Sequence, residues 1–216
     1  MSGVKAARKP LSTGALRGIW AVVIAVVILG LALGTRVVPS DDPLAQGNVA
    51  FDPATFGGEN FPTIQEGVSE RAVKAVTLAD AIAADADAAG AEYAVQSSGG
   101  PVYSVTFTGV VGEGQSGIYE VAVEGMPEDL LVRVQTGPAI NGTELRDATG
   151  DIEFGQFKNQ IDFQNAAAAL NDALKAEVLD GVDTASLSGK TIEVTGAFTL
   201  VNPSAWLITP VELTVR

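Results

Sequence analysis

The chain contains no cysteine and no histidine among its 216 residues. Without cysteine the fold gains nothing from disulfides, and no thiol is present to carry a lipid anchor. Without histidine the chain lacks the usual general base near neutral pH and the commonest metal ligand. These absences exclude Ser-His, Cys-His and His-zinc chemistry within the chain, so we expect a non-enzymatic protein with no catalytic residues, no metal site and no cofactor. An enzyme would be limited to carboxylate chemistry.

Basic residues are scarce after position 36, where eight of them stand against 26 acidic residues and the formal charge is −18. A surface of this sign repels phosphate backbones, so we expect no nucleic-acid partner. It also keeps the protein away from anionic lipid headgroups. The length that remains after position 40 suits one domain with one core.

Residues 18–34 form an apolar run without a single charge, and four basic residues precede it. A basic segment before an apolar stretch stays in the cytoplasm, and the chain that follows is translocated. As a helix the run would span about 25 Å, slightly less than a bilayer core of about 30 Å. We predict a cytoplasmic N-terminus over residues 1–17, a single-pass anchor in the inner membrane over 18–34, and a periplasmic remainder. Ala32 and Gly34 leave open a signal segment cleaved before Thr35.

The remainder divides into a linker, a helical segment and a region of alternating strands. Residues 35–62 are rich in Pro, Gly, Asp and Asn, which predicts a linker. Residues 63–93 carry apolar side chains at helical spacing and predict one or two helices. Alternating apolar and polar residues then predict five strands, and an Ala- and Leu-rich segment predicts a helix between the third and fourth. The strands are expected at 102–111, 118–125, 130–136, 190–201 and 206–215, and the helix at 163–179.

The order β-β-β-α-β-β is that of the OB-fold. We therefore expect an α+β fold: an OB-fold-like five-stranded β-barrel with an inserted helix, preceded by a short helical segment and an N-terminal transmembrane helix. The periplasmic domain is placed at residues 63–216. Gly109 and Gly112 late in the first long strand would let that strand bend and serve both sides of the sheet.

Residues 112–117, Gly-Glu-Gly-Gln-Ser-Gly, match the spacing of a dinucleotide-binding loop. Such a loop must open a helix, whose N-terminus binds the pyrophosphate. Here the loop leads directly into a predicted strand. We therefore interpret it as a hairpin turn.

The most distinctive polar segment is 137–163, which follows the third predicted strand. It contains the adjacent opposite charges of Arg146 and Asp147, and then the amides of Asn159 and Gln160 among aromatic residues. One interpretation is a small site in which these four side chains bind a polar ligand. The other is that Arg146 and the amides satisfy backbone carbonyls of an irregular loop packed on the barrel.

Several segments of the chain resemble the DUF2291 family of predicted periplasmic lipoproteins. They are 98–112, 137–171, 187–200 and 207–213, and the likeness extends over roughly 45–215. The resemblance implies a periplasmic location. Members of that family look to be encoded beside sugar ABC transporters, which implies a permease or a solute-binding protein as partner. The chain departs from the lipoprotein pattern because it has no cysteine, so the membrane span would replace the acyl anchor.

Two functions from different classes are compatible with these features. The first is a membrane-anchored periplasmic accessory protein that works with a sugar ABC uptake system. The alternative is a periplasmic binding module that holds a small polar solute or an oligosaccharide on the barrel face or in the 137–163 loop. OB-folds bind sugars as well as nucleic acids.

Overall fold

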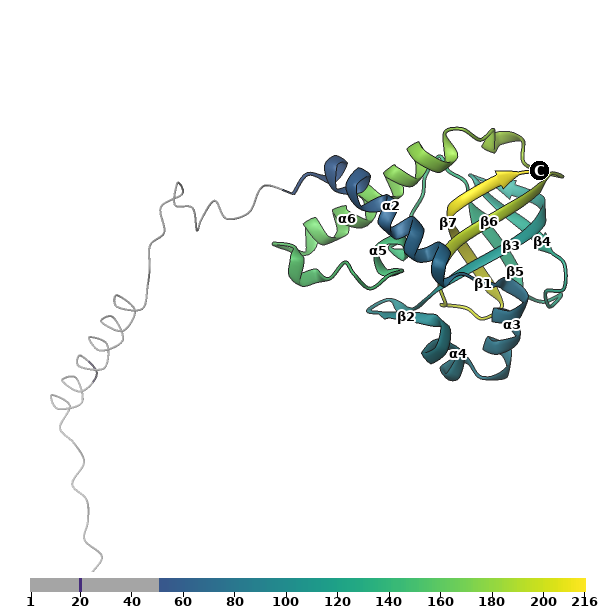
Figure 1. Ribbon diagram of the computed structural model, residues 1–216, viewed down its shortest axis with the longest axis horizontal. Helices are drawn as coiled ribbons and strands as arrows, with labels where there is room; N and C mark the ends of the chain where they lie inside the picture. Colours follow the sequence, from purple (N-terminus) through teal and green to yellow (C-terminus); the bar gives the residue numbers. More distant parts are fainter. Residues whose placement is uncertain (1–19, 21–50) are drawn as a thin grey trace, which may run out of the picture. The chain divides into compact units, whose positions relative to one another are not determined.

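The computed structural model describes Trp20 and residues 51–216 (Figure 1). The chain divides into two units, Met1–Ala50 and Phe51–Arg216, and the second is the domain described below. The cytoplasmic N-terminus predicted over 1–17 lies outside the described residues, as do the anchor or signal at 18–34, apart from Trp20, and the first part of the linker. In the described part of the chain, no helix has both the length and the apolar character that a membrane span requires.

Five strands pair in a closed ring, in the order β3, β4, β5, β7, β6 and back to β3. The β5–β7 pair is parallel and the others are antiparallel. These are the five predicted strands, and the predicted order of an α+β, OB-like fold is confirmed. Their bounds are β3 (Gly100–Gln115), β4 (Ile118–Val123), β5 (Leu131–Gln135), β6 (Thr191–Thr199) and β7 (Ala205–Val215).

Strand β3 lies at the junction of the ring, because β6 pairs with its first half and β4 with its second. The two pairings overlap at Gly109, which faces Ile192 on β6 and Val123 on β4. A Cβ atom at Gly109 would lie 2.6 Å from Val121 Cγ1 and 2.7 Å from the Ala122 oxygen. The strand therefore pairs on both sides, as predicted, and the close approach of β4 requires glycine at position 109, whereas a Cβ atom at Gly112 would meet only ordinary contacts of 3.6 Å or more.

The core is built on a stack of three aromatic side chains from three strands. The Phe198 ring stacks on Tyr103 at 5.5 Å and on Trp206 at 4.6 Å between ring centroids. All three side chains are fully buried. Aromatic pairs of this kind add to the free energy gained by burying their surface, so the stack joins β3, β6 and β7.

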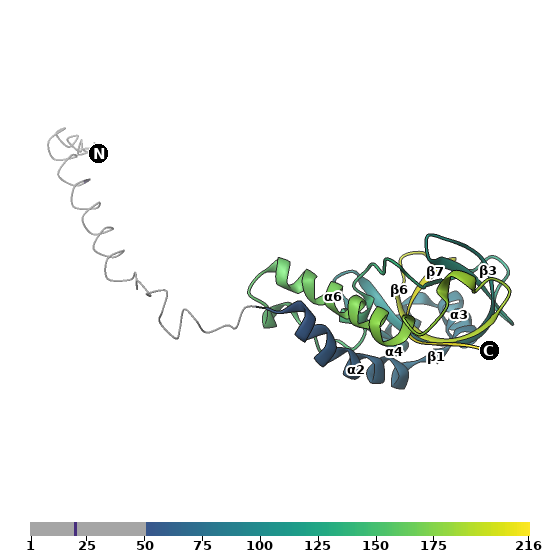
Figure 2. The same cartoon turned by 90° about the horizontal axis from the view of Figure 1, so that it is seen from above.

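Helices and two short strands surround the ring. Helices α2 and α6 lie side by side in both views, while α3 and α4 lie near β1 and β2 (Figures 1 and 2). The short strands β1 and β2 pair with the first half of β3. Their bounds are α2 (Pro53–Arg71), β1 (Val73–Lys74), α3 (Ala75–Ala84), α4 (Ala86–Tyr93), β2 (Ala94–Ser97), α5 (Glu144–Asp147), η1 (Phe154–Gln156), α6 (Gln160–Leu174), the π-helical η2 (Lys175–Leu179) and η3 (Thr184–Ser186).

The linker predicted over 35–62 is wrong in its second part, because α2 begins at Pro53. Asp52 caps this helix by accepting hydrogen bonds from the Ala54 N–H at 3.2 Å and the Thr55 hydroxyl at 2.6 Å. Proline at the first helical position is favourable, since its missing N–H would have no partner there. The domain therefore starts at residue 51 and not at 63.

One of the glycines that made this segment look irregular, Gly57, serves the contact between α2 and α6. A Cβ atom at Gly57 would overlap the Ala169 carbonyl oxygen of α6. The adjacent Gly58 has nothing within 4 Å of such an atom. Of these two glycines, only Gly57 lies at the close contact between the helices. Further along α2, the side chain of Gln65 donates a hydrogen bond to the Val211 oxygen of β7 at 2.7 Å.

We predict opposite effects of the same substitution at these adjacent positions. Gly57→Ala should lower the free energy of unfolding by about 1–3 kcal/mol, because the backbone oxygen of Ala169 cannot move aside. Gly58→Ala should raise it by about 0.5–1 kcal/mol, because alanine is the better helix former. Urea unfolding followed by circular dichroism measures both, and equal effects of the two substitutions would contradict the close helix contact.

Candidate functional site

The polar segment after β5 is held against the sheet by one buried side chain. Gln135 accepts a hydrogen bond from the Asn141 N–H at 3.1 Å. It also donates to the Asn141 oxygen at 2.9 Å and to the Thr209 hydroxyl at 2.8 Å. The segment therefore folds back on β5 and β7 before α5 begins.

Arg146 and Asp147 form a buried ion pair within α5. The guanidinium donates two hydrogen bonds to the carboxylate, at 2.7 Å from Nε and 2.9 Å from Nη2. Nη1 donates to the Phe163 oxygen at 3.3 Å, and the guanidinium carbon lies 3.7 Å from the centre of the Phe163 ring. The Thr143 hydroxyl donates to Asp147 at 2.8 Å. With only 5% and 8% of their surfaces exposed, the two side chains join α5 to α6.

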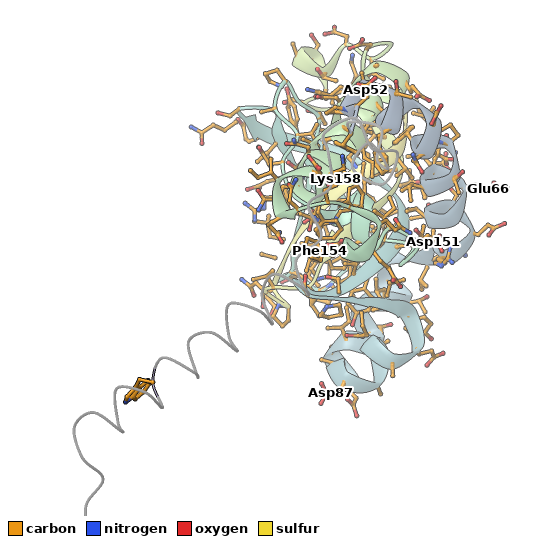
Figure 3. All side chains as sticks on the ribbon, turned by 90° about the vertical axis from the view of Figure 1, so that its left-hand side faces the viewer. Asp52, Glu66, Asp87, Asp151, Phe154 and Lys158 are labelled. Atoms are coloured by element: carbon orange, nitrogen blue, oxygen red, sulfur yellow. The ribbon has the colours of Figure 1, made fainter. Side chains whose placement is uncertain are left out.

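Asn159 and Gln160 lie at the start of α6 and have a different role. The Asn159 side chain accepts hydrogen bonds from the N–H groups of Ile161 and Asp162, at 2.8 and 2.9 Å, and so caps the helix. Gln160 is the exposed first residue of α6. Figure 3 views the domain from this end and labels Phe154 and Lys158, which precede the cap.

The structure thus brings together two of the four predicted site residues and gives the others separate places. The hydrogen bonds of Arg146 and Asn159 match the structural interpretation of this segment, in which polar side chains satisfy the backbone of a loop and a helix start. The ligand role of Arg146, Asp147, Asn159 and Gln160 stays a prediction. The contacts of Arg146, Asp147 and Asn159 lie within the fold.

Glu144 is the acid of this segment whose titration the fold alters most clearly. Burial raises the pKa of its carboxyl above the ordinary value of 4.5, and the nearby Asp147 carboxylate raises it further. A hydrogen bond from Thr199 and the charge of Arg146 act in the opposite direction. One of its oxygens, Oε2, is buried without a hydrogen-bond partner.

A recess on the outer side of β3, β4 and β5 is lined by charged, polar and apolar side chains. Its volume is about 430 Å³, within the range of small-molecule sites, about 300–1,000 Å³. It lies beside the β3–β4 hairpin, whose turn residues Ser116 and Gly117 have φ of 55° and 76°. The segment 112–117 therefore belongs to a β-hairpin, as predicted, with residues 112–115 at the end of β3 and the turn at Ser116 and Gly117. The recess is lined by Glu113, Gly114, Gln115, Ile118, Glu120 and Arg133.

Arg133 is the cation of this recess and has no acid bound to it. It is half-buried, and its Nε is buried without a hydrogen-bond partner. Glu120 is its neighbour across the β4–β5 pair. Ion pairs within residues 51–216 include Arg146–Asp147, Lys175–Asp172 and Arg216–Glu193, and Arg133 is a member of none of these three.

Sequence reasoning missed this recess. Arg133 and Glu120 stand at alternate positions of their strands, where charged residues ordinarily face solvent. Nothing in that pattern distinguishes a binding face from a solvated one. A second recess of about 370 Å³ lies between α3 and the sheet, but its Glu193 is already paired with Arg216. In the part of the chain that the structure describes, no three acidic side chains are placed to hold a metal ion.

Comparison with known proteins places the chain in one family and one fold. A family model described as "Predicted periplasmic lipoprotein (DUF2291)" matches residues 22–214. The chain is similar to the crystal structure of an OB-fold protein from Thermotoga maritima, with a TM-score of 0.62 and 20% identity. The match covers 78% of this chain and 100% of that one, and at this identity it shows the fold alone. No curated protein matches the sequence.

We predict that Arg146→Ala lowers the free energy of unfolding by about 3–5 kcal/mol, because it leaves the Asp147 carboxylate buried and unpaired. Arg146→Lys should give a smaller loss, since lysine keeps the charge but not the two parallel hydrogen bonds. Lys175→Ala is the control, because its pair with the exposed Asp172 should contribute less than about 1 kcal/mol. Unchanged stability in Arg146→Ala would favour the ligand role of this arginine.

Because its pKa is raised, Glu144 should contribute less to the free energy of unfolding as the pH rises. The folded protein holds this proton more tightly than the unfolded chain, so the contribution is complete below the unfolded pKa and is lost as the pH rises through the folded one. Glu144→Gln should remove this loss. The free energy of unfolding of both proteins is measured in urea from about pH 4 to about pH 7, where carboxyl groups with a raised pKa titrate. A constant difference between them would contradict the prediction.

Proposed function

The chain belongs to the DUF2291 family of predicted periplasmic lipoproteins, and from this premise we propose that it is a non-enzymatic accessory protein of a sugar ABC uptake system. The observation that carries the proposal is the family match over residues 22–214, which includes most of the apolar run as well as the OB-like domain. The 216 residues contain no cysteine for lipid attachment. In this proposal residues 18–34 therefore anchor the domain in the inner membrane.

With a tether of this kind, weak contacts between the domain and a permease would be sufficient for binding. A domain held in the same membrane as a permease has a high effective concentration near it, so binding needs little affinity of its own. The eight basic and 24 acidic side chains of residues 51–216 give the domain a formal charge of −16. That charge disfavours nucleic acid and anionic lipid as partners.

We predict that a strain without this protein takes up its transported sugar more slowly, and that the full chain restores uptake. The full chain should stay in the membrane fraction after a high-salt wash, because an apolar span is not held by charge. A form whose residues 1–34 are replaced by a cleavable signal peptide should be released and should restore uptake poorly. Uptake of radiolabelled sugars and the amount of protein in each fraction are the measurements.

The control is a form in which an unrelated membrane span replaces residues 18–34. It should restore uptake, since only the tether matters. Uptake that is the same with and without the protein would contradict the accessory role. A released species that begins near Thr35 would instead show that the segment is a cleaved signal.

A second function is favoured by the recess beside the β3–β4 hairpin. There the domain would act as a binding module for a small polar solute or an oligosaccharide. Arg133 lines this recess and takes part in none of the ion pairs described above, and OB-folds bind ligands on the face of their second and third strands. In this chain those strands are β4 and β5.

A further inference from the structure

Five of the eight phenylalanines lie together where the chain enters the domain. Their rings contact one another at 5.2–5.8 Å between centroids. They are Phe51, Phe56, Phe154, Phe157 and Phe163. The domain begins at Phe51, so these rings lie at the junction between the domain and the preceding chain.

This junction carries exposed apolar side chains. Phe154 exposes 50% of its surface, and Ile161, the second residue of α6, exposes 67%. The other exposed large apolar residues of the domain come singly from β3, β5 and the β6–β7 connection, which is ordinary for a soluble surface. Two such residues beside a group of contacting rings indicate an interaction site. We call Phe51, Phe154, Phe157 and Ile161 the entry surface.

The chain that precedes the domain indicates what covers the entry surface. The apolar run proposed as the membrane anchor ends at residue 34, and the domain begins at Phe51. The intervening residues span at most about 3.6 Å each and keep Phe51 within about 60 Å of the end of that run. Because the tether is attached at Phe51, this end of an anchored domain meets the lipid surface more often than the opposite end does.

The charges at this end exclude an attraction to anionic lipid. Four acidic residues and one basic residue lie next to the entry surface in the chain, and Figure 3 labels three of them. They are Asp52, Asp151, Glu153, Asp162 and Lys158. A contact driven by basic residues is therefore excluded, and an apolar contact remains. Phenylalanine and isoleucine reach the boundary between headgroups and acyl chains, where neighbouring charged groups can stay hydrated.

We propose that the entry surface docks on the zwitterionic lipid surface of the membrane that anchors the chain, with Phe154 and Ile161 entering the interface. Docking at this end orients the domain on the membrane, which a tether alone does not do. Weak contacts suffice, because the tether gives the domain a high effective concentration at the lipid surface. The inference rests on the membrane anchor of the proposed function and adds the lipid contact of the domain itself.

The test uses the full chain in phosphatidylcholine nanodiscs, which contain no second protein. Because the chain has no cysteine, Gln160→Cys gives a single site for a nitroxide label beside Ile161, and Glu128→Cys labels the exposed β4–β5 connection. Electron paramagnetic resonance compares collisions of each label with oxygen, which partitions into lipid, and with a water-soluble nickel complex. The label at position 160 should be accessible to oxygen and protected from nickel, and the label at position 128 should show the reverse.

Substitutions test the two assigned side chains. Phe154→Ser combined with Ile161→Ser should lower the ratio of docked to undocked protein by about tenfold or more, because two apolar side chains no longer enter the interface. Phe154→Leu stays apolar and should dock normally. Val201→Ser is the matched control, since it removes an exposed apolar side chain elsewhere in the domain and should change nothing. Circular dichroism checks folding, and Ile161→Ser alone, which leaves the rings intact, replaces the double variant if that one unfolds.

The lipid composition tests the role of charge. Phosphatidylglycerol in the discs should weaken docking at low salt, because the acidic residues of this end are repelled, and added salt should reverse the effect. Docking that becomes stronger with phosphatidylglycerol would overturn the inference. So would a label at position 160 that stays accessible to nickel, or a double serine variant that docks as well as the natural protein.

These outcomes can be told apart from a failure of the proposed function. Protein that does not elute with the discs would show that the anchor fails, and docking with it. Protein that elutes with the discs while the label at position 160 stays in water would show that docking alone fails. Sugar uptake that does not depend on the protein would refute the accessory role and leave docking unaffected.

Discussion

Strand β3 has to form hydrogen bonds along both edges, and the whole domain depends on it. One edge binds β6 over Val102–Val110, while the other binds β2, β1 and β4 in turn. The ring closes only because β4 and β6 can both pair with the strand at Gly109, where a side chain would collide with Val121. A closed sheet leaves few unpaired edges, so this one glycine supports both the core and the arrangement of strands that creates the recess.

Two arginines close to each other in sequence, Arg133 and Arg146, differ in whether they have a partner within the fold. Arg146 is buried with its carboxylate partner, and each of its three nitrogens donates a hydrogen bond within the fold. Such a pair is weak evidence for high stability, because both charges lose their hydration, but removing one partner is costly. Arg133 lies on the outer side of the sheet with a buried donor unused. Arg146 is therefore paired within the fold, while Arg133 is not part of such a pair.

The helices act as a second layer that fixes the polar segment after β5. Helix α2 packs on α6 through the backbone contact at Gly57, and α6 carries the Phe163 ring against which Arg146 lies. Four phenylalanines continue this contact: Phe51, Phe56 and Phe157 lie next to one another, and Phe157 lies next to Phe163, at 5.2–5.8 Å between ring centroids. This aromatic cluster holds the start of the domain to the start of α6.

The sequence by itself determined the strand order, the inserted helix, the hairpin turn and the family, because each depends on local alternation, helical spacing or turn residues. It also determined the chemistry that the chain lacks. Only the tertiary structure decided that residues 53–62 are helical, since Gly57 and Pro62 disfavour a helix locally and the contact with α6 outweighs them. It likewise decided that Arg146, and not Arg133, forms a buried ion pair within the fold. Glu120 and Arg133 meet through strand register, a long-range pairing that neither segment encodes alone.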